Sequence, residues 1–337
     1  MRVKVGQNYS SSHEMPFSVP QGTILGPFLY LGYASTLDDI VTDKMGKLSG
    51  FADDHGLRQP FKASDRQQER LIVNGLEKSM IAIKNWMDAN KLQMNSAKTE
   101  LIMFGNKVQL NKCVTSHITV DDALVERSSV IKYLGVVLDD NLSLRKHIVA
   151  KCKTASFNLH NIRSIRTSLT VEACKQVVHG LVLSHLDYCN ALYMGLPKLD
   201  IQRMQRIQNA SAKLILNLHK MDSSTEALKT LHWLPIYYRI IFKVLTLVHK
   251  CLHGLAPSYL MNLLSLSSTS SYSLRSSKRT NILHVPRTYA KSFADRSFSV
   301  FAPKHWNTLP DNIRQITSLT QFRKELKTYL FHQAFDS

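Results

Sequence analysis

The spacing of apolar residues predicts short strands in the first part of the chain. Arg2–Val5 and Met15–Val19 are expected to form two strands joined by a polar turn at residues 7–13. The following stretch, Ile24–Val41, is mostly apolar and predicts a buried helix. A membrane span is disfavoured because its uncharged apolar core, which ends at Leu37, is too short to cross a bilayer.

The next segment has the periodicity of an amphipathic helix. Its apolar positions recur at spacings of four, four, three and four residues: Ile72, Leu76, Met80, Ile83 and Met87. This spacing forms one apolar stripe along a helix. Ser64 is predicted to cap the first turn, Gln67 to complete a capping box, and Asn90 to end the helix.

Further strands are expected before residue 140. Glu100–Phe104 is one, and His117–Val120 is expected to pair with Ala123–Glu126 around a turn at Asp121 and Asp122. Val130–Leu138 is predicted to be another strand, containing the turn-permissive Gly135.

After Asp140 the pattern becomes helical. The predicted helices are Ser143–Ile165, Val171–Leu183, Leu199–Leu218, Ser223–Leu231, Ile236–His253 and Leu319–Phe331. The serine-rich stretch Ser265–Ser277 is interpreted as a loop or linker. The fold class is therefore α+β, with a mixed region at 1–140, a helical region at 141–264, and a linker with a C-terminal helical region at 265–337.

Composition favours a folded protein with a basic second half. Hydrophobic residues make up 44% of the 337 positions and the net charge is +18. Residues 1–110 contain 13 lysines and arginines against 11 acids, whereas residues 111–337 contain 30 against 14. A polyanion such as nucleic acid would bind this half through phosphate neutralisation. A solvated basic surface without a partner is the alternative.

The cysteines and the N-terminus give weaker signals. The five cysteines form no CxxC pair, which favours reduced thiols in an intracellular protein. No secretory signal is recognised, because the first ten residues are polar and basic.

Asp53 and Asp54 are the leading candidates for chemistry. They are flanked by the apolar runs Gly50–Ala52 and Leu57–Phe61, which predicts a hairpin with both carboxylates at its tip. An Asp-Asp pair alone is more often a simple turn. A Gly/Pro-rich loop about 30 residues upstream adds weight to a functional interpretation.

Four segments together resemble reverse transcriptases of LINE-like and jockey-like retrotransposons, which lack long terminal repeats. Ser18–Pro27 resembles their SVPQGSxLGPxL loop, and Phe51–Asp54 their (Y/F)ADD hairpin. Asn95–Glu100 resembles the NxxKTE segment, and Lys132–Val136 the KYLGV segment of the primer-grip strand. Their order and spacing match those of the family. The resemblance is extensive from about Arg2 to Leu138 and softer beyond, for example in the segment Leu186-Asp187-Tyr188-Cys189.

The resemblance implies a partial right-hand polymerase, in which an incomplete palm precedes a helical thumb and C-terminal region. Asp53 and Asp54 would bind two Mg²⁺ (or Mn²⁺) ions, the hard cations that carboxylate oxygens suit. Lys98 would stabilise the leaving pyrophosphate or donate a proton, although an ordinary surface lysine is the alternative.

The resemblance also assigns substrate contacts. Gln21 and Gly22 would line the nucleotide and template pocket, where a glycine lets the backbone approach the substrate. Tyr133, Leu134 and Gly135 would position the primer end. The implied partners are an RNA template, a DNA primer and deoxynucleoside triphosphates.

Part of the implied polymerase is expected to be missing. The family's metal site uses another aspartate from an earlier palm strand, upstream of the strand that matches Arg2–Val5. The fingers and an upstream endonuclease are also expected to be absent. Asp38, Asp39 and Asp43 are candidates to replace the aspartate, but helix-end surface residues are the better interpretation. We therefore expect a truncated chain with little or no activity alone.

Two weaker patterns occur in the helical half. Arg203, Arg206, Lys213 and Lys220 recur along one predicted helix and would track a nucleic-acid backbone or form a solvated face. His249 and His253 have the spacing of a zinc pair, but the HExxH glutamate and an obvious third ligand are missing, so zinc is disfavoured.

The sequence therefore predicts a fragment of an RNA-directed DNA polymerase. A non-enzymatic nucleic-acid-binding remnant is the chief rival, and a pseudogene product without a stable fold is a third possibility. No membrane association is expected, nuclear action is implied by the family, and the oligomeric state is left open.

Overall fold

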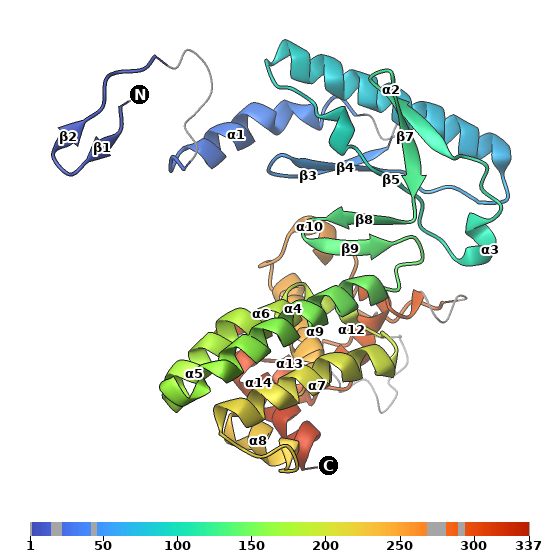
Figure 1. Ribbon diagram of the computed structural model, residues 1–337. Coiled ribbons are helices and arrows are strands. Elements are labelled where there is room, and N and C mark those ends of the chain that lie inside the picture. Colours follow the sequence, from blue (N-terminus) through green and yellow to red (C-terminus); the bar gives the residue numbers. More distant parts are fainter. Residues whose placement is uncertain (1, 15–21, 42–45, 268–280, 289–293, 337) are drawn as a thin grey trace. The chain divides into compact units, whose positions relative to one another are not determined.

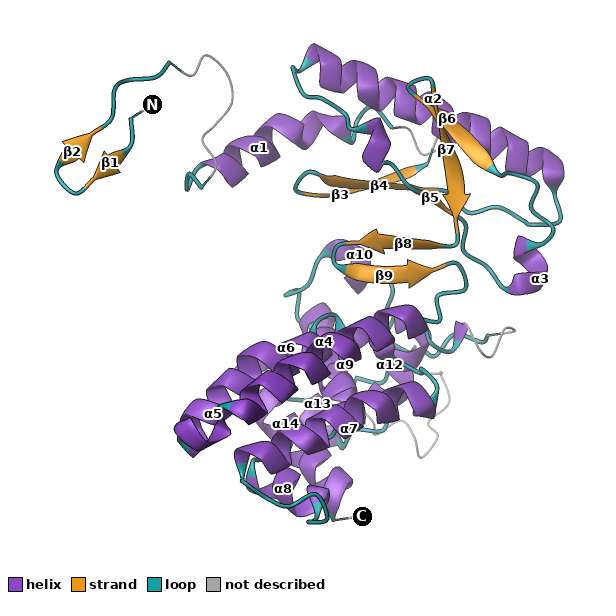
Figure 2. Ribbon diagram, viewed as in Figure 1, coloured by secondary structure: helices purple, strands orange, loops and turns teal. Residues whose placement is uncertain are grey.

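The computed structural model describes residues 2–14, 22–41, 46–267, 281–288 and 294–336 (Figure 1). The chain forms two compact units. Met1–Gly135 with Asp139–Leu142 make up the first unit, and Val136–Leu138 with Ser143–Ser337 make up the second. Figure 2 shows that arrows occur only in the N-terminal part of the chain and that helices make up most of the rest. The predicted α+β class is therefore confirmed.

The first unit combines small sheets with one long helix. Its strands are β1 (Lys4–Val5), β2 (Asn8–Tyr9), β3 (Lys47–Phe51), β4 (Asp54–Arg58), β5 (Leu101–Ile102), β6 (His117–Val120), β7 (Ala123–Ser128) and β8 (Val130–Tyr133). Its helices are α1 (Gly26–Ala34), α2 (Arg66–Ala89) and α3 (Lys107–Leu110), with the 3₁₀ turns η1 (Ser35–Leu37) and η2 (Ser96–Lys98).

Antiparallel hairpins account for most of the strand pairing. β3 pairs with β4, and β6 pairs with β7 around Asp121 and Asp122, as predicted. β5 pairs with β7 in parallel, which gives the sheet order β5-β7-β6. The helix α2 lies across β6 and β7 in Figure 1, and Ile118, Val120 and Val125 form a small core against residues of α2.

Part of the turn predicted over residues 7–13 forms a strand instead. Lys4–Val5 pairs with Asn8–Tyr9, within the segment expected to be a turn. Gly6, at φ 61°, supplies the backbone conformation that so tight a turn needs. The other predicted strand, Met15–Val19, lies outside the described residues.

The expectation of one strand over Val130–Leu138 was also wrong. The segment folds back on itself, and β8 pairs with β9 (Val136–Asp139). Leu134 and Gly135 have φ angles of 46° and 75°. Two successive residues with positive φ are typical of a type I′ hairpin turn, and Gly135 adopts this conformation without steric cost.

The helix predicted over Ile24–Val41 is shorter than expected and is not buried. Helix α1 contains no buried residue, and Phe28 is 71% exposed. Its apolar side chains are distributed around the whole helix, so no single stripe selects a buried face. Beyond α1, Leu37 and Val41 are buried in a small core with Ile83 of α2, and Ile40 packs against it.

Helix α2 begins one residue later than the capping prediction implied. Its cap is Asp65, whose carboxylate accepts a hydrogen bond from the Gln68 backbone N–H at 2.9 Å. Ser64 therefore does not cap the helix. Glu69, buried in the first turn, accepts hydrogen bonds from the backbone N–H groups of Val114 and Thr115 at 3.0 and 2.8 Å. These bonds attach the helix to the segment that leads into β6.

The second unit is helical. It contains α4 (Arg145–Ser164), α5 (Val171–Val178), α6 (Ser184–Asp187), α7 (Lys198–Ile215), α8 (Ser224–Thr230), α9 (Ile236–Leu252), α10 (Ser258–Met261), α12 (Phe298–Trp306), α13 (Asp311–Arg314) and α14 (Leu319–Phe335). The 3₁₀ turns η3 (Arg166–Ser168) and η5 (Asn190–Tyr193) connect some of these helices.

One extensive core holds these helices together. Helix α9 has nine buried residues, six of which, including Val244 and Val248, belong to this core. Trp306 of α12 and Phe322 of α14 are fully buried in the same core, with ring centroids 5.7 Å apart. No helix among the described residues is long and apolar enough to cross a membrane.

The helix predicted over Val171–Leu183 contains a change of winding. Its last five residues, His179–Leu183 (η4), form a π-helical turn between α5 and α6. The side-chain amide of Asn158 in α4 donates a hydrogen bond to the backbone oxygen of Leu181 at 2.7 Å. The contact satisfies a carbonyl in the wider turn.

Candidate active site

The β3–β4 hairpin presents the two candidate aspartates. Asp53 lies in its two-residue turn, and Asp54 is the first residue of β4, paired with Phe51. Both side chains are exposed. Ala52, the other turn residue, has a φ of 52°, in the positive-φ region that tight hairpin turns use. The predicted hairpin with carboxylates at its tip is therefore present.

Two aromatic residues near Asp53 were not anticipated from the sequence. Nδ1 of His55 lies 3.1 Å from the backbone oxygen of Asp53. The pKa of Tyr30 in α1 is raised, first by burial and then by the negative charge of Asp53. Tyr30 lies in an apolar run that predicted only a buried helix, so its electrostatic interaction with Asp53 could not be anticipated from the sequence.

The oxygen ligands of the aspartate pair are of the type that divalent cations prefer, but the pair alone does not form a complete coordination shell. Mg²⁺ prefers carboxylate oxygens and keeps waters and substrate phosphates as its other ligands. Among the described residues, no group of three acidic, histidine or cysteine side chains could hold a metal ion. The hairpin therefore supplies two carboxylates, and a cation bound there would need further ligands.

Tyr133 packs against the same hairpin. A methyl group on Gly56 of β4 would lie 3.2 Å from the hydroxyl oxygen of Tyr133 in β8. The glycine therefore provides space for the phenol, two residues after Asp54. A glycine inside a strand is a known sign of close approach, and this signal was available in the sequence.

The other predicted residues of this unit are less closely connected to the hairpin. Lys98 is exposed in η2, and no hydrogen bond or ion pair is recorded between it and the aspartates in the described part of the chain. Gly22 is exposed with a φ of 90°, a conformation that suits glycine. Gln21 and Asp43 lie outside the described residues, and Asp38 and Asp39 are exposed.

The basic residues predicted along one helix have different environments. Nε of Arg203 is 3.8 Å from the buried carboxylate of Asp200, and Nζ of Lys213 donates to the Lys220 backbone oxygen at 2.7 Å. Arg206 is exposed on α7. Lys220 lies beyond the end of α7. These four residues therefore do not form one uniform basic face.

His249 and His253 are in contact but make packing and backbone interactions. Their rings stack with centroids 4.1 Å apart, and His249 also stacks on Phe322. Nε2 of His249 lies 2.8 Å from the Ile316 backbone oxygen, and Nδ1 of His253 lies 2.8 Å from the His249 backbone oxygen. Burial lowers the pKa of His249. No third ligand is present among the described residues.

Comparison with known proteins identifies relatives among mobile elements. The chain is 24% identical over 211 residues to the probable RNA-directed DNA polymerase from transposon X-element of Drosophila melanogaster, covering 61% of this chain and 22% of the relative. It is 24% identical to the corresponding protein from transposon BS of the same species, covering 63% and 24%. No family model and no solved structure matches.

A third relative is the RNA-directed DNA polymerase from mobile element jockey of Drosophila melanogaster. It is 26% identical over 151 residues, which cover 43% of this chain and 16% of the relative. The matches therefore span less than a quarter of the length of these curated proteins. Over about half its length, the chain is homologous to the RNA-directed DNA polymerases of non-long-terminal-repeat retrotransposons.

Proposed function

We propose that this chain carries part of the nucleotide-adding centre of an RNA-directed DNA polymerase, with Asp53 and Asp54 as its metal-binding carboxylates. The observation that carries the proposal is the exposed β3–β4 hairpin with both aspartates at its tip. The homology to polymerases of mobile elements supports it.

Different residues of the first unit would bind the metal ions, line the substrate pocket and stabilise the leaving group. Asp53 and Asp54 would hold two Mg²⁺ or Mn²⁺ ions, which supply activation of the primer hydroxyl and charge stabilisation at the triphosphate. Gln21 and Gly22 would line the nucleotide and template pocket. Lys98 would stabilise the leaving pyrophosphate or donate a proton.

Tyr133, Leu134 and Gly135 would position the primer end. The contact between Tyr133 and Gly56 supports this role, because it attaches the β8 strand to the hairpin that carries the aspartates. The partners would be an RNA template, a DNA primer and deoxynucleoside triphosphates, and the expected place of action is the nucleus.

We expect weak or no primer extension from these 337 residues by themselves. The resemblance implies a metal site with one further aspartate, and among the described residues no third acidic, histidine or cysteine side chain joins the pair. Losing a ligand from that site would cost several kcal/mol of transition-state stabilisation. A chain that binds nucleic acid without extending a primer is the second candidate, favoured by the excess of 16 positive charges over residues 111–337.

Metal binding tests the proposal independently of turnover. Mn²⁺ binding to the full chain would be measured by electron paramagnetic resonance with primer–template and a deoxynucleoside triphosphate present. We expect Asp53→Asn, Asp54→Asn to weaken it at least tenfold. Asp121→Asn, Asp122→Asn is the matched control, because it removes the same charge from an exposed aspartate pair at the turn between β6 and β7. Equal binding by the two variants would disprove the proposed metal site.

Primer extension on an RNA template then separates the two functions. Extension that disappears only in Asp53→Asn, Asp54→Asn would support a working polymerase and contradict our expectation of weak activity. Salt-sensitive binding of primer–template without extension would support the non-catalytic alternative.

A further inference from the structure

The β3–β4 hairpin has two faces, and His55 lies on the face opposite to the contact with Tyr133. Successive residues of a strand point to opposite sides of a sheet. His55 precedes Gly56 in β4, so its side chain points away from the Tyr133 side. It shares its face with Leu48 and Leu57, a cross-strand pair that packs against the small core formed with α2.

A glycine opposite His55 leaves room for the imidazole. Gly50 of β3 is the cross-strand partner of His55. A methyl group on Gly50 would lie 3.3 Å from Cδ2 and 3.4 Å from Nε2 of the ring, so this edge of the imidazole covers the glycine. An aromatic ring over a cross-strand glycine compensates for the missing side chain. The half-buried ring is therefore held by packing beside the turn.

Another atom of the same ring contacts the turn itself. Nδ1 of His55 lies 3.1 Å from the backbone oxygen of Asp53. A carbonyl oxygen can only accept a hydrogen bond, so Nδ1 carries the hydrogen and donates it. The pairing of β3 with β4 ends at Phe51 and Asp54, so the strand ladder does not restrain this carbonyl. The imidazole supplies that restraint.

The restrained carbonyl belongs to the peptide group that joins the two aspartates. Its direction depends on ψ of Asp53 and φ of Asp54, which also determine how the two carboxylates are directed. Ala52, the other turn residue, has a φ of 52°, a conformation that is unfavourable for a residue with a Cβ atom. Such a turn keeps one conformation only when surrounding contacts stabilise it.

We propose that His55 is a positioning residue for the metal-binding carboxylates, holding the peptide between Asp53 and Asp54 in the orientation that directs both side chains to a divalent cation. This role rests on the proposed function of the hairpin. His55 acts from behind the site, because strand alternation places the Asp54 side chain on the Tyr133 face and the imidazole on the other. A ring that only fills space over Gly50 is the alternative.

Two substitutions of His55 separate its hydrogen bond from its packing. His55→Phe keeps an aromatic ring over Gly50 and removes the donor. His55→Asn removes the ring but places an amide N–H close to the position of Nδ1. His117→Phe in β6 is the matched control, because it makes the same replacement in the hairpin that β6 forms with β7.

The carbonyl carbon of Asp53 gives a measurement that needs no metal ion. In the full chain with isotopically labelled aspartate alone, NMR correlation of each carbonyl carbon with the following amide nitrogen detects only Asp-Asp pairs. The signal of Asp53 is the one that Asp53→Asn removes. It should move upfield in His55→Phe, where the hydrogen bond is lost, and return in His55→Asn. An unchanged signal in His55→Phe would overturn the proposal.

Mn²⁺ affinity of the same variants connects the turn to the site. It is measured by electron paramagnetic resonance with primer–template and a deoxynucleoside triphosphate present. We expect about tenfold weaker Mn²⁺ binding in His55→Phe, and binding within about twofold of the unchanged chain in His55→Asn and His117→Phe. Equal weakening by His55→Asn and His55→Phe would overturn the proposal in favour of packing.

The aspartate variant keeps the two proposals distinguishable. Unchanged Mn²⁺ binding in Asp53→Asn, Asp54→Asn would disprove the proposed function of the hairpin. A loss of Mn²⁺ binding in that variant without any loss in His55→Phe would disprove only the role of His55.

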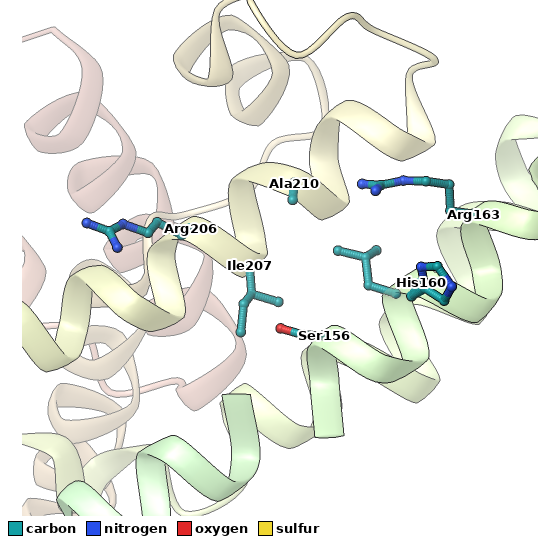
Figure 3. Close-up of a pocket in the computed structure, with 7 residues that line it drawn as sticks. Ser156, His160, Arg163, Arg206, Ile207 and Ala210 are labelled. Carbon is teal, nitrogen blue, oxygen red and sulfur yellow. The ribbon is translucent and has the colours of Figure 1, made fainter. Parts of the chain in front are cut away.

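A control in the second unit tests whether Mn²⁺ affinity merely follows nucleic-acid contact. Arg163 and Arg206 are exposed and line a groove of about 310 Å³ between α4 and α7 (Figure 3). Arg163→Gln, Arg206→Gln removes two charges there and leaves the hairpin of the first unit unaltered. With saturating primer–template, its Mn²⁺ affinity should equal that of the unchanged chain. A loss as large as that of His55→Phe would overturn the assignment to the turn.

Discussion

The guanidinium of Arg239 in α9 binds both carboxylate oxygens of Asp187 at the end of α6. Nε donates to Oδ1 at 2.9 Å, and Nη2 donates to Oδ2. The side chains are only 19% and 30% exposed, so water weakens this pair less than a pair on the open surface. Asp187 therefore connects the segment Leu186-Asp187-Tyr188-Cys189 to the central helix of the second unit.

Removing this charge should destabilise the protein. Asp187→Asn keeps the shape of the side chain but leaves Arg239 without its charged acceptor, and we expect a loss of about 1–3 kcal/mol in the free energy of unfolding. Urea denaturation followed by circular dichroism measures it. Glu172→Gln is the control, since its pair with Lys175 is long and exposed and should change stability by less than about 0.5 kcal/mol. Equal losses would contradict the proposed role of Asp187.

The cap of α2 gives a second prediction. Asp65→Ala removes the acceptor for the Gln68 N–H and should cost about 1 kcal/mol, whereas Ser64→Ala should cost little. Hydrogen exchange at the amides of the first turn of α2 distinguishes the two variants. Faster exchange in Ser64→Ala than in Asp65→Ala would show that the sequence-based capping prediction was right after all.

The space at Gly56 gives a third prediction. Gly56→Ala would place a methyl group 3.2 Å from the Tyr133 hydroxyl, so the Tyr133 side chain must move by a few tenths of an ångström. We expect a loss of about 1 kcal/mol in the free energy of unfolding. Adding Tyr133→Phe removes the crowded oxygen and should restore most of the lost stability. A double variant as unstable as Gly56→Ala would mean that the strain lies elsewhere.

His147 gives a prediction about pH. Its Nδ1 accepts a hydrogen bond from the Val137 backbone N–H at 3.2 Å, and burial, followed by the charge of Lys151, lowers its pKa to about 4. The unfolded chain takes up this proton near pH 6.5 and the folded chain only near pH 4. Stability should therefore be complete above pH 6.5 and decrease by about 2–3 kcal/mol as the pH falls toward 4.

Urea denaturation at pH 7 and pH 5 measures the effect of His147. In His147→Gln, whose amide oxygen can accept the same hydrogen bond but does not titrate, the decrease in stability between these pH values should be smaller. His249 and His305 also have lowered pKa values, so a reduced pH dependence will remain. An unchanged decrease in His147→Gln would disprove the assignment to this residue.

Helices and turns were predicted well where the residues of the element itself determine its conformation. Helix α9 was expected over Ile236–His253 and occupies Ile236–Leu252, because its apolar stripe is continuous. The hairpin at Asp121 and Asp122 was expected because aspartates tolerate positive φ in turns. Helix α12 was missed, since Pro303 inside it normally argues against a helix.

Predictions that depend on distant contacts were less successful. The burial expected for α1 depends on a partner surface that its own residues do not specify. In the candidate site, the aspartate hairpin could be predicted from neighbouring residues. Tyr30 and Tyr133 are far from it in the sequence, and their positions are set by tertiary packing.

Val136 of β9 also affects how the protein can be divided for experiments. Its side chain is 5% exposed within the core of the helical unit, although it precedes the first helix of that unit by nine residues. A fragment that starts at Ser143 would lack Val136 and would also lose the donor to His147. Such a fragment would expose apolar surface and tend to aggregate, whereas one that starts before Val136 would keep this part of the core intact.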